Sequence, residues 1–451
     1  MNLARTPFRP CYARRSGGSL PPVPEKGEGT ARMNPARFTK RWTLYVRRVF
    51  ILAAIVVALL SSSAPAKADI KIGLIVPLTG DLGAFGEGMV NGVRLAIEEI
   101  NAEGGVLGQA LRLAIGDTQT KPQAGVDTAQ KLVAIEGVSV LLGAQSSGVT
   151  IPVALSVSKV QKVLQISAAS TSPTITTLDD GDFLFRTVPS DLYQGLALAE
   201  VVHETGYRNI AILYVNNDYG DGLARSFEQA FAALGGATSA ALAYEPGNPS
   251  YRGELAAAAR GGGEALLLIG YPEYGITILR QALEEGYFQK FVFPDGMKSP
   301  VIIEQIGPYL EGAIGTNPAP LAEAAPVQHF RRSYEERYGE PPAAPFIDGV
   351  YDALYLVALA MERAKSADRV AIRDALRAVA GPPGIKVRPG EWGSAKALIA
   401  EGREVDYVGA AGDHDFDAAG DVAGTFAFWR IEDGAFVTIK VFKPGGEGVS
   451  P

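Results

Sequence analysis

The sequence predicts an α/β protein in which two doubly wound parallel-sheet lobes enclose a ligand cleft between them. Two observations carry this prediction. From Asp69 to about residue 167, short apolar runs alternate with amphipathic runs in the order strand, helix, strand. A second series of the same kind covers about residues 183–296, with no Ser/Gly-rich linker before it. Two such units suggest lobes that face one another at the carboxyl ends of their strands, where α/β sheets bind ligands.

The first series contains four expected strands and three expected helices. The strands are at 70–76, 110–116, 138–143 and 162–167, and the helices at 88–105, 122–137 and 149–161. Apolar residues at 89, 93, 97 and 100 give the first helix a one-sided spacing, and a Gly-Gly pair ends it. This βαβ order predicts a parallel sheet with helices on both faces.

The second series repeats this organisation. Its strands are expected at 183–188, 209–215, 237–244, 264–270 and 291–296, and its helices at 193–206, 221–236, 251–263 and 274–286. Helices then follow at 326–338 and 346–365, with short strands near 384–388, 425–431 and 436–441.

The first 68 residues differ from the rest in charge and predict a secretory signal. They hold twelve Lys and Arg against two Glu, which leaves the remainder strongly acidic. An apolar run at 49–60 is too short to span a bilayer. Ala66-Lys67-Ala68 then offers small residues for cleavage before Asp69. We expect residues 1–68 to be removed, and Met33 is an alternative start because a normal signal has about 30 residues at most.

The rest of the chain disfavours several classes of function. Its acidity disfavours binding to nucleic acid or to anionic membranes. The only cysteine, Cys11, lies in the predicted signal, so we expect no disulfide, no catalytic thiol and no lipid-modified N-terminus. Three scattered histidines disfavour a zinc site, and residues 413–421 lack EF-hand spacing and predict a turn. We expect a soluble periplasmic protein without metal or cofactor.

Three loops that follow strands of the first series are candidates for ligand contact. They are PLTGDLGAFGEG at 77–88, GAQSSG at 143–148 and SAASTSP at 167–173. The first has neither dinucleotide nor Walker spacing, so it forms tight turns or lines a ligand. The other two offer hydroxyl and N–H groups at helix starts, which either cap the helices or bind a carboxylate.

A serine nucleophile in GAQSSG is the enzymatic alternative. The segment lacks G-x-S-x-G spacing, and no histidine follows a strand of the first series. We therefore expect no enzyme, although triad partners are neighbours in space rather than in sequence. Loops of the second series instead offer Tyr219, Tyr271 and Asp295. One lobe suits a carboxylate and the other suits an ammonium group with a small apolar chain, as an amino-acid site requires.

At these residues the sequence resembles the periplasmic Leu/Ile/Val-binding proteins, the receptors of branched-chain amino-acid ABC importers. The resemblance covers about the whole mature chain. It is carried by residues 72–108, 141–154, 166–176, 185–195, 215–224, 294–296, 381–392 and 406–434.

The resemblance implies a type I binding-protein fold with three crossovers, near Pro189, Pro318 and Gly424. The implied first lobe comprises residues 69–188 plus 319–423. The implied second lobe comprises residues 189–318 plus 424–451.

The resemblance also implies ligand-binding roles in the first lobe. Ser147 is expected to bind the ligand carboxylate through its hydroxyl and backbone N–H. Ala169 is expected to offer its carbonyl to the ammonium group, and Thr171 to contact the ligand with hydroxyl and backbone. Phe85 stands where an aromatic residue, often Tyr or Trp, lines the side-chain pocket.

In the second lobe, Tyr219 and Tyr271 are expected to close over the ligand, and Asp295 to pair with its ammonium group. The segment at 270–275 is one residue shorter than the usual form, which leaves Tyr274 as an alternative to Tyr271. The acid is Asp rather than Glu, and the cysteine pair of some members is absent. These departures weaken leucine as the specific ligand.

The function implied is that of an import receptor. It would bind a neutral, branched-chain-like amino acid by hinge closure and deliver it, as a monomer, to an ABC permease in the membrane. A sensory receptor of the same fold, for an amide, urea or an aromatic acid, is the alternative. The third hypothesis is an exported serine hydrolase with Ser147 as its nucleophile.

Overall fold

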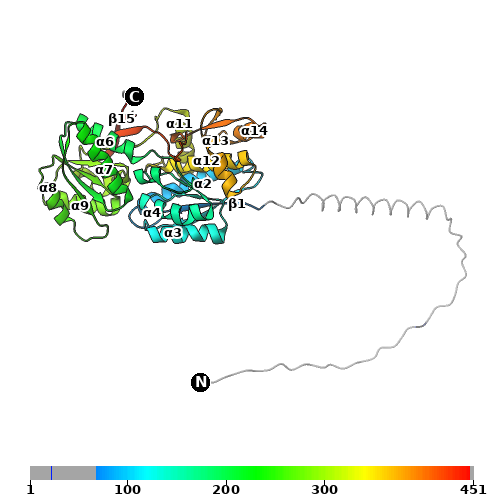
Figure 1. The fold of residues 1–451 in the computed structure, drawn as a ribbon, viewed down its shortest axis with the longest axis horizontal. Helices are drawn as coiled ribbons and strands as arrows, with labels where there is room; N and C mark the ends of the chain where they lie inside the picture. The colour runs from blue at the N-terminus through cyan, green and yellow to red at the C-terminus, as the bar shows by residue number, and fades with distance from the viewer. Residues whose placement is uncertain (1–21, 23–67, 447–451) are drawn as a thin grey trace, which may run out of the picture. The chain divides into compact units, whose positions relative to one another are not determined.

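A computed structural model describes Pro22 and residues 68–446 of the chain. The predicted signal therefore lies outside the described residues, apart from Pro22 and Ala68. Lys67–Pro451 forms one compact unit, which Figure 1 shows coloured by residue number. Among the residues that the structure describes, no helix has both the length and the apolar character needed to cross a membrane.

The first lobe, as we call it, consists of a five-stranded parallel sheet and the helices that cover it. The strand order is β2-β1-β3-β4-β5, and every neighbouring pair is parallel. The strands are β1 (Ile70–Val76), β2 (Leu111–Asp117), β3 (Val140–Leu142), β4 (Leu164–Ser167) and β5 (Leu184–Arg186). Strands β3, β4 and β5 are buried at every position, as expected for a parallel sheet covered on both faces.

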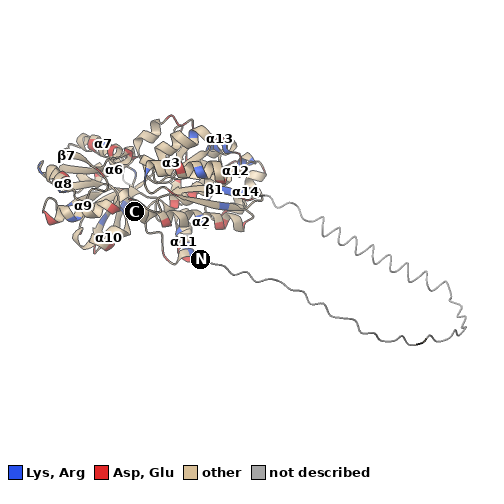
Figure 2. Cartoon of the chain, turned by 90° about the horizontal axis from the view of Figure 1, so that it is seen from below, with Lys and Arg blue, Asp and Glu red and all other residues tan. Residues whose placement is uncertain are grey.

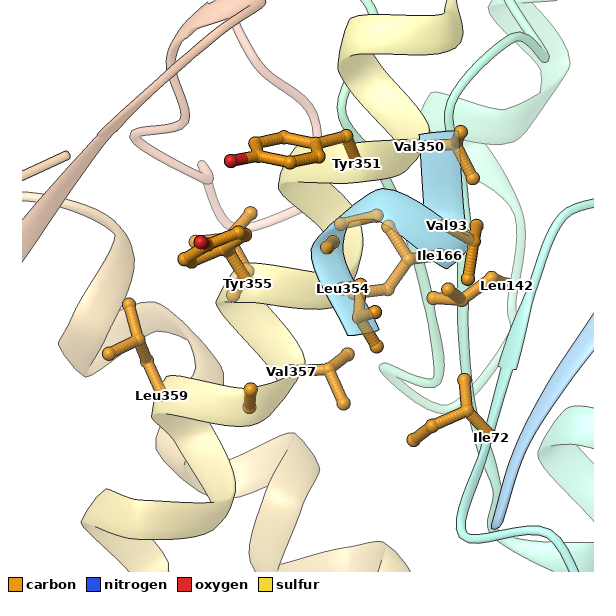
Figure 3. Packing of buried hydrophobic residues seen from close by; sticks show 14 of the residues in the cluster. Ile72, Val93, Leu142, Ile166, Val350, Tyr351, Leu354, Tyr355, Val357 and Leu359 are labelled. Carbon is orange, nitrogen blue, oxygen red and sulfur yellow. The ribbon is translucent and has the colours of Figure 1, made fainter. Parts of the chain in front are cut away.

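The helices of this lobe come from two distant stretches of sequence. They are α2 (Gly86–Ala102), α3 (Pro122–Lys131), α4 (Ser147–Val153), α5 (Lys159–Gln161), α11 (Ala325–Tyr338), α12 (Ile347–Ala364), α13 (Arg369–Ala380) and α14 (Trp392–Ala400). Helix α12 forms the centre of the core: its Leu354 and Val357 are fully buried and face Ile72, Leu142 and Ile166 of the strands (Figure 3).

The second lobe consists of a seven-stranded sheet and its helices, in the strand order β15-β14-β10-β9-β8-β6-β7. The strands are β6 (Asn209–Val215), β7 (Ala237–Tyr244), β8 (Ala265–Ile269), β9 (Phe291–Phe293), β10 (Ile314–Pro318), β14 (Phe426–Glu432) and β15 (Ala435–Phe442). The helices are α6 (Asp191–Glu204), α7 (Asp218–Ala233), α8 (Arg252–Ala259), α9 (Pro272–Glu284) and α10 (Pro300–Ile306). A small third sheet joins β11 (Ile385–Val387), β12 (Val405–Gly409) and β13 (Gly412–Asp413).

The predicted α/β class with parallel-sheet lobes is confirmed, with two refinements. The second sheet is mixed, because β14 pairs antiparallel with both β10 and β15. The sequence prediction also omitted the strands β10, β12 and β13 and the helices α10, α13 and α14; in β10 and β12, polar residues interrupt the apolar run. The chain passes from the five-stranded to the seven-stranded sheet after β5, leaves it after β10 for helices of the first lobe and the small third sheet, and returns to it at β14. The exact lobe boundaries stay a prediction.

Candidate ligand-binding site

Loops from both lobes meet around one cavity. Loops that follow β1, β3 and β4 approach it from the first lobe, and loops that follow β6, β8 and β9 approach it from the second. Six of the seven predicted site residues line this cavity: Phe85, Ser147, Ala169, Tyr219, Tyr271 and Asp295. Leu82, Gln145, Gly296 and Phe346 line it as well, and the sequence interpretation did not include them.

Thr171 is the predicted residue that does not line the cavity. It is fully buried, and its hydroxyl has no hydrogen-bond partner. Its carbonyl accepts a 2.8 Å hydrogen bond from the N–H of Asp191, at the start of α6. Thr171 therefore lies behind the cavity wall, where it connects the hydroxyl-rich loop to the second lobe.

Two hydroxyls and one backbone N–H of the SAASTSP loop hold the GAQSSG loop in place. Ser167 donates to the carbonyl of Ala144 at 2.6 Å, and Ser170 donates to the carbonyl of Gln145 at 3.1 Å. Ser147 accepts from the N–H of Ser172 at 3.2 Å. These bonds fix the two loops against one another, as buried polar groups in satisfied networks usually do. The capping alternative for Ser146 fails, because its side chain makes no capping bond at the start of α4.

Arg186, at the end of β5, supports the same loops and was missed from the sequence. Its guanidinium is fully buried and donates to the carbonyl of Ser172 at 3.0 Å. Asp421 holds the other side of the guanidinium with two bonds of 2.6 Å. The sequence did contain a signal for it, an arginine inside the apolar run FLFRTV. Because an unpaired buried charge is costly, such an arginine indicates a buried acidic partner.

On the opposite wall, two tyrosines stack on one another, and one of them binds an acid. The rings of Tyr219 and Tyr271 stack with centroids 5.7 Å apart. Tyr219 donates its hydroxyl to Asp295 Oδ1 at 2.6 Å, and the N–H of Gly296 donates to the same oxygen at 2.8 Å. A side chain at Gly296 would lie 2.6 Å from the carbonyl of Gly270, so this turn requires glycine.

One tyrosine also connects the two lobes. The hydroxyl of Tyr271 lies 3.4 Å from Ser146 Oγ in the first lobe and accepts from Asn217 Nδ2 at 3.2 Å. Tyr274 is half-buried and does not line the cavity. The geometry thus favours Tyr271 over Tyr274 as the aromatic residue that closes the site.

Burial controls the ionisation of the acids at the site. It raises the pKa of Asp295 to about 6, against the opposing effect of the hydrogen bond from Tyr219. A second acid, Asp191, is fully buried, and neither of its carboxylate oxygens has a hydrogen-bond partner. Burial and the charge of Asp295 raise the pKa of Asp191 well above its ordinary value. Removing both protons would place two carboxylates side by side in a dry interior, which is unfavourable.

Apart from Gln145, the rest of the cavity is apolar. Leu82, Phe85 and Phe346 line it and are buried. Among the described residues that line the cavity there is no Lys, Arg or His, and the titratable side chains are Asp295, Tyr219 and Tyr271. Between Asp69 and Gly446, no cluster of three potential metal ligands occurs. The arrangement suits a small molecule that carries hydrogen-bonding polar groups and a neutral side chain.

Comparisons with known proteins agree with this geometry. The family model described as periplasmic binding protein matches residues 69–435. The chain is 29% identical over 342 residues to the leucine-, isoleucine-, valine-, threonine- and alanine-binding protein of Pseudomonas aeruginosa, covering 75% of this chain and 90% of that protein. It is 27% identical over 384 residues to the chemotactic signal transduction system substrate-binding protein BasB of Halobacterium salinarum, covering 83% and 90%.

A solved structure is also similar. The leucine-binding protein of Thermotoga maritima superposes with a TM-score of 0.72 at 26% identity, covering 83% of this chain and 99% of that chain. The predicted resemblance to Leu/Ile/Val-binding proteins and the predicted type I fold are therefore confirmed. Because the family model spans most of the sequence, this chain belongs to the periplasmic binding protein family.

Proposed function

We propose that this protein is an extracytoplasmic receptor of an ABC importer that binds a neutral amino acid between its lobes. The observation that carries the proposal is the position of Asp295, a buried acid that lines the cavity opposite the loop of Ser147. A zwitterion presents its carboxylate and its ammonium group to such opposite walls. The names of the Pseudomonas and Thermotoga relatives, both amino-acid-binding proteins, support this class of ligand.

In this proposal the first lobe binds the ligand carboxylate. The hydroxyl of Ser147 accepts from the N–H of Ser172, so its own proton is available to donate to an oxygen of the ligand. The N–H of Ser147 lies at the first position of α4, where the helix itself leaves the N–H groups unpaired.

The second lobe binds the ammonium group. Ionised Asp295 would accept from it, together with the carbonyl of Ala169 across the cavity. Tyr219 keeps the carboxylate in place, and Tyr271 covers the ligand when the lobes close. Hydrogen bonds to charged groups contribute about 1.5–3 kcal/mol each, so this contact would be among the strongest at the site.

The proposed context is the periplasm, reached through a cleaved signal and without a lipid anchor. The partner would be the membrane permease of an ABC importer, contacted by a monomeric receptor in its closed form. In Figure 2, blue and red segments are scattered over both lobes, which gives no support to nucleic-acid binding. N-terminal sequencing and mass spectrometry of the exported protein, produced from the full-length precursor, would test cleavage before Asp69.

A sensory receptor is the second candidate, because BasB of Halobacterium salinarum is named as part of a chemotactic system. Deleting the gene separates the two functions. A transport receptor is required for uptake of labelled amino acid. A sensor is required for the behavioural or transcriptional response and leaves uptake unchanged.

The direct test is a ligand screen with a variant of the acid. We expect a neutral amino acid to raise the melting temperature, since it binds only the folded protein. Asp295→Asn should weaken binding measured by calorimetry at pH 7.5 by about 1.5–3 kcal/mol. Asp127→Asn, at an exposed position of α3, is the matched control. Equal affinities of wild type and Asp295→Asn would refute the ammonium assignment.

A further inference from the structure

Gln145 is the polar residue of the cavity wall that the proposed contacts with the charged ends of the ligand do not use. Its side chain is 5% exposed and lines the cavity. Its Oε1 is buried and has no hydrogen-bond partner. Buried polar atoms are nearly always paired, so an orphan at a binding cavity indicates that a ligand completes it.

Two other buried glutamines have side-chain oxygens that the fold itself pairs, whereas the Oε1 of Gln194, which does not line the cavity, also has no partner. Gln165 is fully buried, donates to the carbonyl of Gly143 at 3.0 Å and accepts from Ser158 Oγ at 2.7 Å. Gln281 accepts from the N–H of Tyr251 at 2.7 Å. The side-chain oxygen of Gln145 makes no comparable bond, and the residue lines the cavity.

The backbone of Gln145 is fixed, which keeps its amide at the cavity. Its carbonyl accepts from Ser170 Oγ, and the preceding carbonyl, of Ala144, accepts from Ser167 Oγ. The following residue, Ser146, is tied to Tyr271 across the cleft. The segment therefore does not rotate away to give the amide another partner without breaking these bonds.

The partner of Gln145 is identified by elimination, and this step rests on the proposed amino-acid function. Ser147 and Asp295 take the two charged ends of the ligand. Leu82, Phe85 and Phe346 then surround what remains, the ligand side chain, together with Gln145. No cationic side chain lines the described cavity, so the side chain of the ligand is not an acid. A neutral group with an N–H or O–H proton satisfies Oε1.

We propose that Gln145 determines specificity by accepting a hydrogen bond from the ligand side chain. The ligand class is then a neutral amino acid with a hydroxyl or a carboxamide, such as threonine, serine, asparagine or glutamine, in preference to a purely aliphatic one. A site built to hydrogen-bond a substrate group discriminates strongly against the analogue that lacks it, because the buried protein atom is left unpaired.

The test compares near-isosteric ligand pairs by isothermal titration calorimetry. L-Threonine is paired with L-valine, and L-asparagine with L-leucine. We expect wild type to bind the polar member of at least one pair about tenfold more tightly, as for one net hydrogen bond to a buried group. Gln145→Leu should reduce this ratio by about tenfold. Gln289→Leu, the same change at an exposed position, should leave it unchanged.

The outcomes are distinguishable. A ratio equal in wild type and Gln145→Leu overturns the proposal for Gln145 while leaving amino-acid binding intact. If neither wild type nor Asp295→Asn binds any of the four amino acids, the proposed function is overturned as well. Gln145→Met, which keeps the length of the side chain without its amide, replaces the leucine variant if that protein fails to fold.

Discussion

At the scale of single residues, two buried acids dominate the site. Asp295 has hydrogen bonds from Tyr219 and Gly296, whereas Asp191 has none. Both pKa values are raised, first of all by burial. A carboxylate without partners in a dry interior is expensive unless it is protonated or meets a cation. The pair therefore couples the proton and the ligand ammonium group at one place.

This coupling predicts opposite pH trends for affinity and for stability. Because burial raises the pKa of Asp295 to about 6, affinity for an amine ligand should fall as the pH drops through this value, about tenfold between pH 7.5 and pH 5. The raised pKa also stabilises the ligand-free protein fully below the ordinary value of 3.8, and this stability is lost as the pH rises through about 6. Asp191 acts in the same direction.

Calorimetry at pH 5, 6 and 7.5 measures the first trend, and urea unfolding without ligand measures the second. Asp295→Asn should bind weakly at every pH and should lose the pH trend of affinity, while the part of the stability trend that comes from the burial of Asp191 remains. An affinity that is constant over this range in wild type would contradict the role of Asp295.

Several of these residues were not predictable from sequence, for a common reason. Asp295, Tyr219 and Ser147 follow strands directly, so the rule for α/β sheets located them. Phe346 precedes α12, far from any predicted strand end, and Asp191 reaches the cavity region only through a crossover. Such positions depend on how distant segments meet, which local periodicity does not contain.

At the scale of elements, the helices and strands of both series were predictable because each carries its own apolar period. The contacts between lobes were not. Helix α7 approaches the turn at Pro173–Thr177 through Gly222, and asparagine at 217 caps it by accepting from the N–H of Gly220. The absence of a side chain at 222 is what permits the close approach.

Gly222→Ala should therefore impair closure. A Cβ there would lie 2.6 Å from Pro173 Cδ and 3.3 Å from Ser172 Oγ, and the proline ring is too rigid to yield easily. We expect about tenfold weaker ligand binding by calorimetry, since the lobes must stay slightly apart. Alanine is the better helix former by roughly 0.5–1 kcal/mol, so the ligand-free protein should be at least as stable.

The matched control for this change is Gly253→Ala in α8, where a Cβ would meet nothing within 4 Å. It should bind ligand as wild type does. If Gly222→Ala binds as tightly as this control, the α7 contact does not form part of the closed state.

At the scale of the whole molecule, the two lobes contact one another across the cleft. Leu82 and Phe85 belong to loops of the first lobe, yet both pack into the hydrophobic cluster of the second lobe. Ser146 reaches Tyr271 across the cleft. A ligand that touches both lobes gains its full set of contacts only when the lobes are together. Ligand binding would therefore shift the population towards molecules in which the lobes touch.

Because the lobes touch, a specific cross-link across the cleft can be designed. A Cβ at Gly148, in the first lobe, would lie 3.6 Å from the Cβ of Asn217, in the second. Disulfides usually join Cβ atoms about 3.5–4.5 Å apart. The sole cysteine of the sequence, Cys11, lies in the predicted signal, so the mature protein offers a clean background. The double variant Gly148→Cys/Asn217→Cys should therefore form a disulfide in the closed state alone.

The rate of this oxidation reports on closure. Because ligand favours the closed lobes, a saturating amino acid should accelerate disulfide formation, followed by non-reducing electrophoresis. The oxidised protein should release labelled ligand far more slowly than the reduced protein, and dithiothreitol should restore release. Each single variant should show neither effect. A cross-linking rate that ligand does not change would mean that the lobes already close without ligand. Binding would then not depend on a change in the population of closed molecules.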